Sequence, residues 1–153
     1  MKKKIIYSIV FSVVILLLVF INDYMSYSIR IGDTQLYFVE TMAMSEDGEP
    51  LMGLFCKTMK AGYKGVEMGG FPRAVLWNDK YLISKNHNGK DTTINSYVII
   101  NQDSINEWDG SISDIHKFKD AEEYHGYLRE ISLSESNMKK VDNHVKWWQM
   151  LFK

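Results

Sequence analysis

The amino-terminal segment is the feature that most constrains what this chain can fold into. Three lysines at positions 2–4 precede seventeen residues, 5–21, in which only Tyr7, Ser8 and Ser12 carry polar side chains. A basic start followed by a long apolar run is typical of an export signal or a membrane anchor. Because basic residues stay on the cytoplasmic side, the pattern predicts that the rest of the chain lies outside the cytoplasm.

The length of the apolar run favours an anchor that is kept over a signal that is cleaved. As a helix, residues 5–21 would span roughly 25 Å, near the lower limit for crossing a bilayer. The best cleavage site, Ser-Tyr-Ser at residues 26–28, has no alanine. We therefore expect a single-pass cell-membrane protein, with residues 1–22 as a transmembrane signal anchor and residues 23–153 as one periplasmic or extracellular domain. Secretion after signal cleavage is the alternative.

The charge and cysteine content of the remaining chain limits its partners and its source of stability. Beyond residue 22 there are fifteen basic and nineteen acidic residues, a net charge of −4. This acidic balance argues against a nucleic-acid partner, which would require a basic face. The single cysteine, Cys56, cannot form an intramolecular disulfide, so a hydrophobic core must stabilise the domain.

Two β-hairpins are predicted from alternating apolar residues around short turns. In the first, the turn Gly32-Asp33 would place Ile29 opposite Leu36. In the second, the turn Asn78-Asp79 would place Val75 opposite Leu82. Residues 94–101 read as a further strand, so we expect an antiparallel meander over residues 73–101.

The last third of the chain changes to helical spacing. Asp120, followed by Glu123 three residues later, is a capping-box pattern that opens a helix over residues 121–131. A second helix is predicted from an apolar stripe formed by Met138, Val141, Val145, Trp148 and Leu151. Strands followed by helices predict an α+β fold, a mostly antiparallel sheet with the two C-terminal helices packed on one face.

Three segments carry a resemblance to known proteins: Trp-Asn-Asp-Lys-Tyr-Leu-Ile at 77–83, Tyr-Val-Ile-Ile-Asn at 97–101, and Asp-Ala-Glu-Glu at 120–123. Their order resembles that in small exported bacterial proteins of unknown function. There, a Tyr-Leu-Ile strand precedes a Tyr-x-Ile-Ile-Asp/Asn strand and a C-terminal helical segment. The resemblance covers about 60 residues. It implies export and a bacterial source, and it brings no catalytic residue.

Two metal hypotheses come from the side-chain chemistry. His116, His125 and Glu122 would form a site if the fold brought them together, although their spacing matches no metal motif. A soft-ligand set for copper is offered by Met42, Met44, Met52, Cys56, Met59 and Met68. Methionine also fills gaps in hydrophobic cores and free cysteine is often buried, so we expect structural roles for this second set.

Three other features are read as structural. Cys56 would act as a nucleophile only beside a base that lowers its pKa, and its apolar neighbours favour a buried strand position. The glycines at 62–70 match neither a dinucleotide-binding nor a P-loop pattern and indicate an irregular loop. Trp147 and Trp148 fit core packing, with a membrane interface or a partner's groove as the alternative.

The sequence thus assigns no catalytic residue, no cofactor-binding residue and no metal ligand. We expect a non-enzymatic binding or accessory module, for example of inhibitor or immunity type. Its N-terminal helix would anchor it in the membrane, and it would bind a protein partner in the cell envelope. The alternative is an enzyme or a copper-binding protein whose site is assembled from scattered residues.

Overall fold

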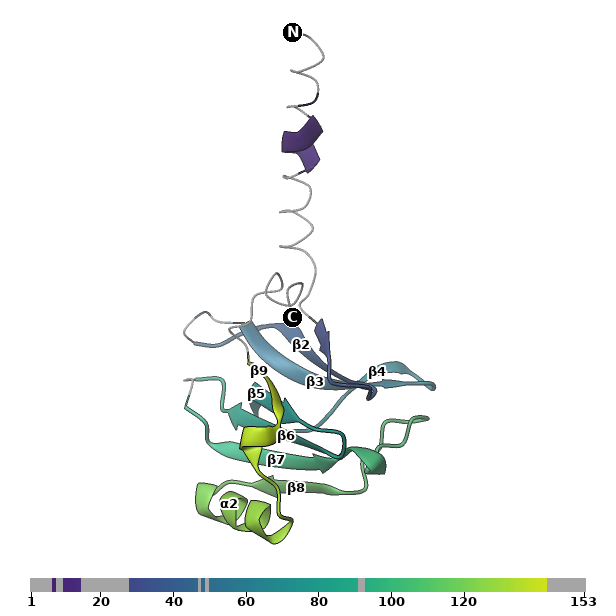
Figure 1. Ribbon diagram of the computed structural model, residues 1–153. Helices are drawn as coiled ribbons and strands as arrows, with labels where there is room; N and C mark the ends of the chain where they lie inside the picture. Colours follow the sequence, from purple (N-terminus) through teal and green to yellow (C-terminus); the bar gives the residue numbers. More distant parts are fainter. Residues whose placement is uncertain are drawn as a thin grey trace.

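The fold is a stack of two antiparallel sheets with one helix on the outside. The computed structural model describes residues 7, 10–14, 28–46, 48, 50–90 and 93–142. Its first sheet contains, in spatial order, β1 (Ser28–Arg30), β2 (Leu36–Met44), β3 (Pro50–Thr58) and β4 (Gly62–Gly65). The second sheet is ordered β8 (Ile115–Phe118), β7 (Ser96–Asn101), β6 (Tyr81–His87), β5 (Phe71–Trp77) and β9 (Lys139–Asp142). Figure 1 shows the first sheet above the second, with α2 (Ala121–Glu130) beyond the second sheet.

The main hydrophobic core lies between the two sheets. Alternate residues of the longer strands point into it, as the two-residue period of a strand requires. The first sheet contributes Phe38, Leu54 and Cys56, all nearly inaccessible to solvent. Val75 of β5 and Val141 of β9 face them from the second sheet, where the two valines are direct cross-strand partners. Burial of these side chains provides the stability that a domain without a disulfide needs.

A second, smaller core attaches α2 to the outer face of the second sheet. Leu76, Ile83 and Ile99 point outward and pack against Tyr124 and Leu128 of the helix. The helix begins where the capping pattern predicts, because the Asp120 carboxylate accepts hydrogen bonds from the backbone N–H groups of residues 122 and 123 at 2.7 and 3.1 Å. The helix therefore covers one face of one sheet only.

The predicted α+β class is wrong in two respects. The strands form two stacked sheets rather than one, because β2, β3 and β4 pair among themselves and not with the meander. The second C-terminal helix is replaced in its first part by β9, which pairs with β5 from Trp77↔Lys139 to Ala74↔Asp142. Residues 143–153, including Trp147 and Trp148, lie outside the described residues. From residue 28 on, the described part of the chain is mainly β, with α2 and two short 3-10 turns, η1 (Gln102–Ser104) and η2 (Glu135–Asn137).

The predicted transmembrane signal anchor is also corrected. Within the described residues, no helix is long and apolar enough to cross a membrane. Tyr7 and residues 10–14 are helical, and the rest of segment 1–22 lies outside the described residues. The single-pass location rested on that anchor, and the same finding counts against it.

Both predicted hairpins form, but each turn is two residues longer than expected. Ile29 pairs with Phe38 instead of Leu36, and Val75 pairs with Ser84 instead of Leu82. A shift of two residues leaves every side chain on its predicted face, whereas a shift of one would have exchanged the faces. Both turns matter because they line opposite walls of the cleft described next.

Candidate functional site

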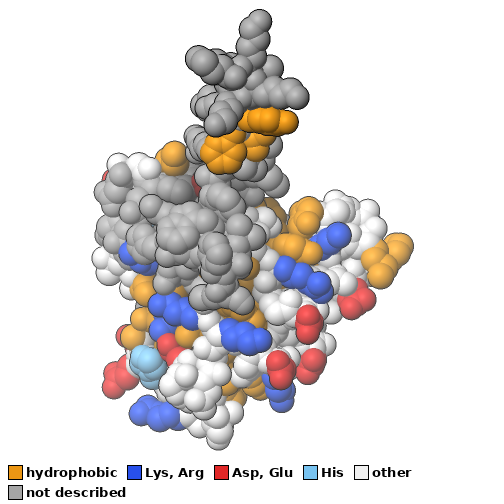
Figure 2. Space-filling view, turned by 45° about the horizontal axis from the view of Figure 1, so that its top comes forward, with side chains coloured by type: hydrophobic (Ala, Val, Ile, Leu, Met, Phe, Trp, Pro, Cys, Tyr) orange, Lys and Arg blue, Asp and Glu red, His pale blue; other side chains and the backbone are white. Residues whose placement is uncertain are grey.

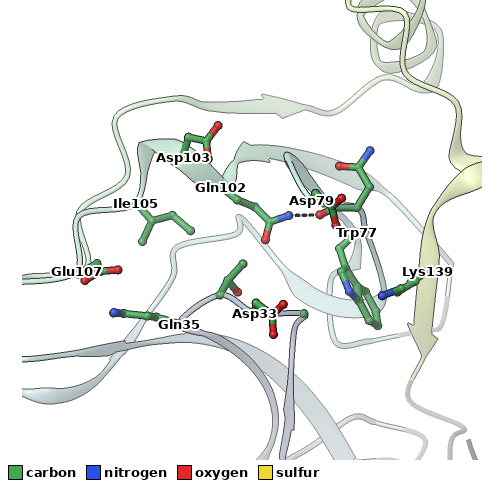
Figure 3. Close-up of a pocket in the computed structure, with 12 residues that line it drawn as sticks. Asp33, Gln35, Trp77, Asp79, Gln102, Asp103, Ile105, Glu107 and Lys139 are labelled. Atoms are coloured by element: carbon green, nitrogen blue, oxygen red, sulfur yellow. Dashed lines mark hydrogen bonds between the residues drawn. The ribbon is translucent and has the colours of Figure 1, made fainter.

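A polar cleft with a volume of about 400 Å³ opens where the two sheets meet at one end. The turn at residues 32–35, between β1 and β2, lines it from the first sheet. The second sheet contributes residues 77–79 at the end of β5 and Lys139 at the start of β9, and the segment after β7 adds Gln102, Asp103, Ile105 and Glu107. Figure 3 shows these side chains approaching the cleft from different sides, with Trp77 and Lys139 next to each other.

The turn from the first sheet is held in place by side-chain hydrogen bonds. The Arg30 guanidinium donates to the carbonyls of Thr34 and Asp33 at 2.8 and 3.0 Å. The Thr34 hydroxyl donates to the Ile31 carbonyl at 2.7 Å and accepts from the Leu36 N–H at 3.1 Å. These bonds explain the two extra residues of the turn, because Thr34 closes it internally instead of pairing across the hairpin.

Gly32 allows this turn to reach Trp77 in the second sheet. Its φ angle is +56°, a backbone conformation that residues other than glycine adopt only with strain. A Cβ at this position would also lie 3.3 Å from the Nε1 atom of Trp77. The backbone of the first sheet therefore approaches the indole ring closely at the floor of the cleft.

The opposite wall is fixed by Asn78 and Gln102. The Asn78 side-chain oxygen accepts from the N–H groups of Lys80 and Tyr81 at 2.9 and 2.7 Å, which closes the β5–β6 turn. Gln102 donates its backbone N–H to the Lys80 carbonyl at 2.8 Å and its side-chain Nε2 to the Asn78 carbonyl. Because Nε2 must face that carbonyl, the Gln102 amide has one orientation and its oxygen points into the cleft (Figure 3).

Three buried polar atoms of the cleft have no hydrogen-bond partner among the described residues. They are Oε1 of Gln35, Oε1 of Gln102 and Nε1 of Trp77. Gln102 as a whole is 8% exposed. Buried polar groups are almost always paired, and an unpaired one costs free energy. A ligand that presented two donors and one acceptor could therefore complete the pairing of these three groups.

The rim of the cleft is acidic. Exposed carboxylates at Asp33, Asp79, Asp103 and Glu107 surround it, and Lys139 is the only basic side chain among the described residues that line it. No set of three or more His, Cys, Asp and Glu side chains within the described ranges is arranged to hold a metal ion. The carboxylates thus create a negative field around the buried acceptors without chelating geometry.

The histidine hypothesis is not supported by the geometry. His116 lies on β8 with its Nε2 atom 2.8 Å from the Asp114 carboxylate, and its ring packs on Tyr127 at 4.5 Å between centroids. His125 is exposed on α2 and packs on the ring of Tyr124. The pKa of Asp114 is lowered, first by the hydrogen bond from the Asn101 side chain and then by His116. These contacts hold β8 and α2 on the second sheet.

The soft-ligand set is dispersed. Met52, Cys56 and Met68 are buried in the core between the sheets, whereas Met44 and Met59 are 65% and 70% exposed. Burial raises the pKa of the Cys56 thiol, which makes it a poorer nucleophile. These positions agree with core packing for the three buried side chains.

Two features of the sequence remain to be placed, the glycine-rich segment and the tryptophan pair. Residues 62–65, which we expected in an irregular loop, form β4 at the edge of the first sheet. Trp147 and Trp148 lie outside the described residues. Residues 62–65 do not line the cleft.

The sequence analysis missed Gln35, Trp77 and Gln102. Each stands at the end of a strand or in a turn, where amides and aromatic residues are common and give no periodic signal. Only the stacking of the two sheets brings these three positions together. The one local hint is the pair Asn101-Gln102, which stands where the buried apolar strand β7 ends.

A comparison with protein-family models found no match, and neither did comparisons with curated proteins and with solved structures. The functional argument therefore rests on the geometry of the cleft.

Proposed function

We propose that this protein is a non-enzymatic binding module that recognises a protein partner through the acidic cleft. The observation that carries the proposal is the convergence of Gln35 Oε1, Gln102 Oε1 and Trp77 Nε1, all buried and without a partner among the described residues. A polypeptide supplies both donors and acceptors from its backbone and side chains, so it pairs with all three.

The rigidity of the walls supports a binding role. The turns are fixed by the side chains of Arg30, Thr34 and Asn78, and the Gln102 amide is fixed by its bond to the Asn78 carbonyl, so these walls are formed before a partner arrives. Preorganisation of this kind reduces the entropy lost on binding. The exposed acidic rim adds long-range attraction for a basic surface and speeds association. An inhibitor or immunity-type protein that occupies the basic site of an enzyme or toxin is the concrete form that this arrangement favours.

Site-specific photo-crosslinking in the producing cells tests the proposal. A benzophenone amino acid is placed at Asp79 on the rim or, as a matched exposed control, at Glu122 on α2. We expect a discrete crosslinked protein from position 79 and none from position 122. The crosslink should disappear when Gln102→Leu is added. Equal products from both positions, or a crosslink that is indifferent to Gln102→Leu, would contradict the proposal.

A further inference from the structure

We infer that the cleft binds an arginine side chain presented by the partner, an inference that rests on the proposed function and specifies its ligand. The acidic rim alone would not identify a site. The second observation is Gln102, which as a residue is only 8% exposed and whose Oε1 points into the cleft without a partner among the described residues.

The polarity of the unpaired atoms selects the ligand. Two of the three are amide oxygens, at Gln35 and Gln102, and these accept hydrogen bonds but cannot donate them. They come from opposite sheets, so a ligand must present donors in two directions. Guanidinium offers five N–H donors in a planar fork and no acceptor, whereas an ammonium group is a compact point charge. The acceptor pair thus fits arginine better than lysine.

The charge around the cleft also favours a cationic ligand such as arginine. Four rim carboxylates face a single lysine among the described lining residues, so the local field favours a cation. A bare metal ion would satisfy the oxygens, but the carboxylates of the described residues do not converge in chelating geometry. An anion would meet repulsion from the rim.

Trp77 accounts for the remaining contacts. Its indole N–H is a donor and therefore needs an acceptor, which the main-chain carbonyl of an extended peptide provides. Its ring offers an apolar surface on which a guanidinium can stack. An arginine within a peptide thus supplies donors for the two amides, a carbonyl for the indole and a positive charge for the rim.

The test uses the full chain and two capped tripeptides, Gly-Arg-Gly and Gly-citrulline-Gly. Citrulline has nearly the shape of arginine but is neutral and replaces one donor nitrogen with an oxygen. The readout is the NMR signal of the Trp77 indole N–H, assigned by its loss in Trp77→Phe. We expect saturable shifts with the arginine peptide and affinity at least about tenfold lower for the citrulline peptide, because buried charge-assisted hydrogen bonds are lost. Equal affinities would overturn the inference.

Charge variants on the rim give a second, independent readout. Asp33→Asn with Asp103→Asn should weaken arginine-peptide binding about fivefold or more, since two rim charges are removed. The matched control, Glu122→Gln with Glu123→Gln on α2, changes the net charge equally and should leave affinity unchanged. Lys139→Gln removes the competing cation and should tighten binding about twofold. If the rim pair and its control have the same effect, the inference is wrong.

The outcomes also separate this inference from the proposed function. Failure of both peptides to move the Trp77 signal, with the crosslink from position 79 retained, would overturn the arginine assignment and leave the protein partner in place. A Trp77 shift produced by a neutral oligosaccharide such as cellotetraose, with no crosslink, would overturn both.

Discussion

Two pockets of similar size and opposite charge lie among the described residues, and they differ in how one kind of polar group is paired, the Glu135 carboxylate in one and the Gln35 and Gln102 amide oxygens in the other. The cleft between the sheets has about 400 Å³ and an acidic rim, and the pocket on the outer face of the second sheet has about 330 Å³ and is lined by Arg73, Lys85 and Lys140 with Glu135. In the outer pocket Glu135 accepts from the Lys85 ammonium and, with its other oxygen, from the Tyr124 hydroxyl. In the cleft, three buried atoms have no partner among the described residues.

The contrast shows that charge alone does not distinguish a binding site from a structural one. The network of Glu135, Lys85 and Tyr124 joins η2 to β6 and α2, so its charges hold the outer layer together. Acidic and basic side chains also stand beside each other over the surface shown in Figure 2. Removal of a paired group should therefore cost stability, whereas removal of an unpaired group should cost binding.

The largest expected effect is in the outer pocket. Glu135→Ala leaves the Lys85 ammonium and the Tyr124 hydroxyl without their acceptor, and it should lower the free energy of unfolding by about 2 kcal/mol, the value of hydrogen bonds to a charged group. Urea denaturation measures the change. Glu130→Ala, an exposed acid on the same layer, is the control and should cost less than about 0.5 kcal/mol. A cost for Glu135→Ala no larger than the control's would break the comparison.

The same network should make stability depend on acid pH. Burial would raise the pKa of Glu135, but the hydrogen bonds from Lys85 and Tyr124 outweigh it and the pKa is lowered from 4.5. A carboxyl group with a lowered folded-state pKa stabilises the protein above its ordinary pKa, and this contribution is lost as pH falls through the folded value. The stability advantage of wild type over Glu135→Gln should therefore be full near neutral pH and shrink below pH 4.5. A constant advantage across that range would contradict the network.

A smaller effect is expected at Gln102 in the cleft. Gln102→Leu removes the hydrogen bond to the Asn78 carbonyl and should cost about 1 kcal/mol of unfolding free energy, while it abolishes the crosslink from position 79. Ser84→Ala is the matched control, because its hydroxyl donates to Asn86 inside the core and away from the cleft. That variant should lose comparable stability and retain the crosslink. If both variants lose the crosslink, the cause is destabilisation of the fold and not the missing Gln102 amide.

Local chemistry predicted individual elements well. The α2 start at Asp120 followed from its capping pattern, and the structure confirms it through two backbone hydrogen bonds. The face of the sheet to which each hairpin side chain points followed from the alternation of apolar and polar residues. The register of the two hairpins did not, because Thr34 and Asn78 close the turns with side-chain hydrogen bonds and the strand pairing is shifted by two residues.

Long-range pairing could not be read from the sequence. Met138 and Val141 are three residues apart, which suits a helix, yet Val141 is buried in a strand because it pairs with Val75 at the edge of the second sheet. The separation into two sheets is equally non-local. The cleft depends on that separation, since Gln35 and Gln102 belong to opposite sheets, and this is why no motif pointed to it.

Gln35→Leu is the variant that tests the central claim most directly. No described group pairs with the Gln35 Oε1 atom, so its removal should leave the free energy of unfolding within about 0.5 kcal/mol of wild type or raise it. The same substitution should abolish the crosslink from position 79, because a buried acceptor for the partner is lost. Urea denaturation and crosslinking of this one variant give both values. Retained stability with a lost crosslink is the predicted result, and a loss of more than about 1 kcal/mol with the crosslink intact would contradict the account.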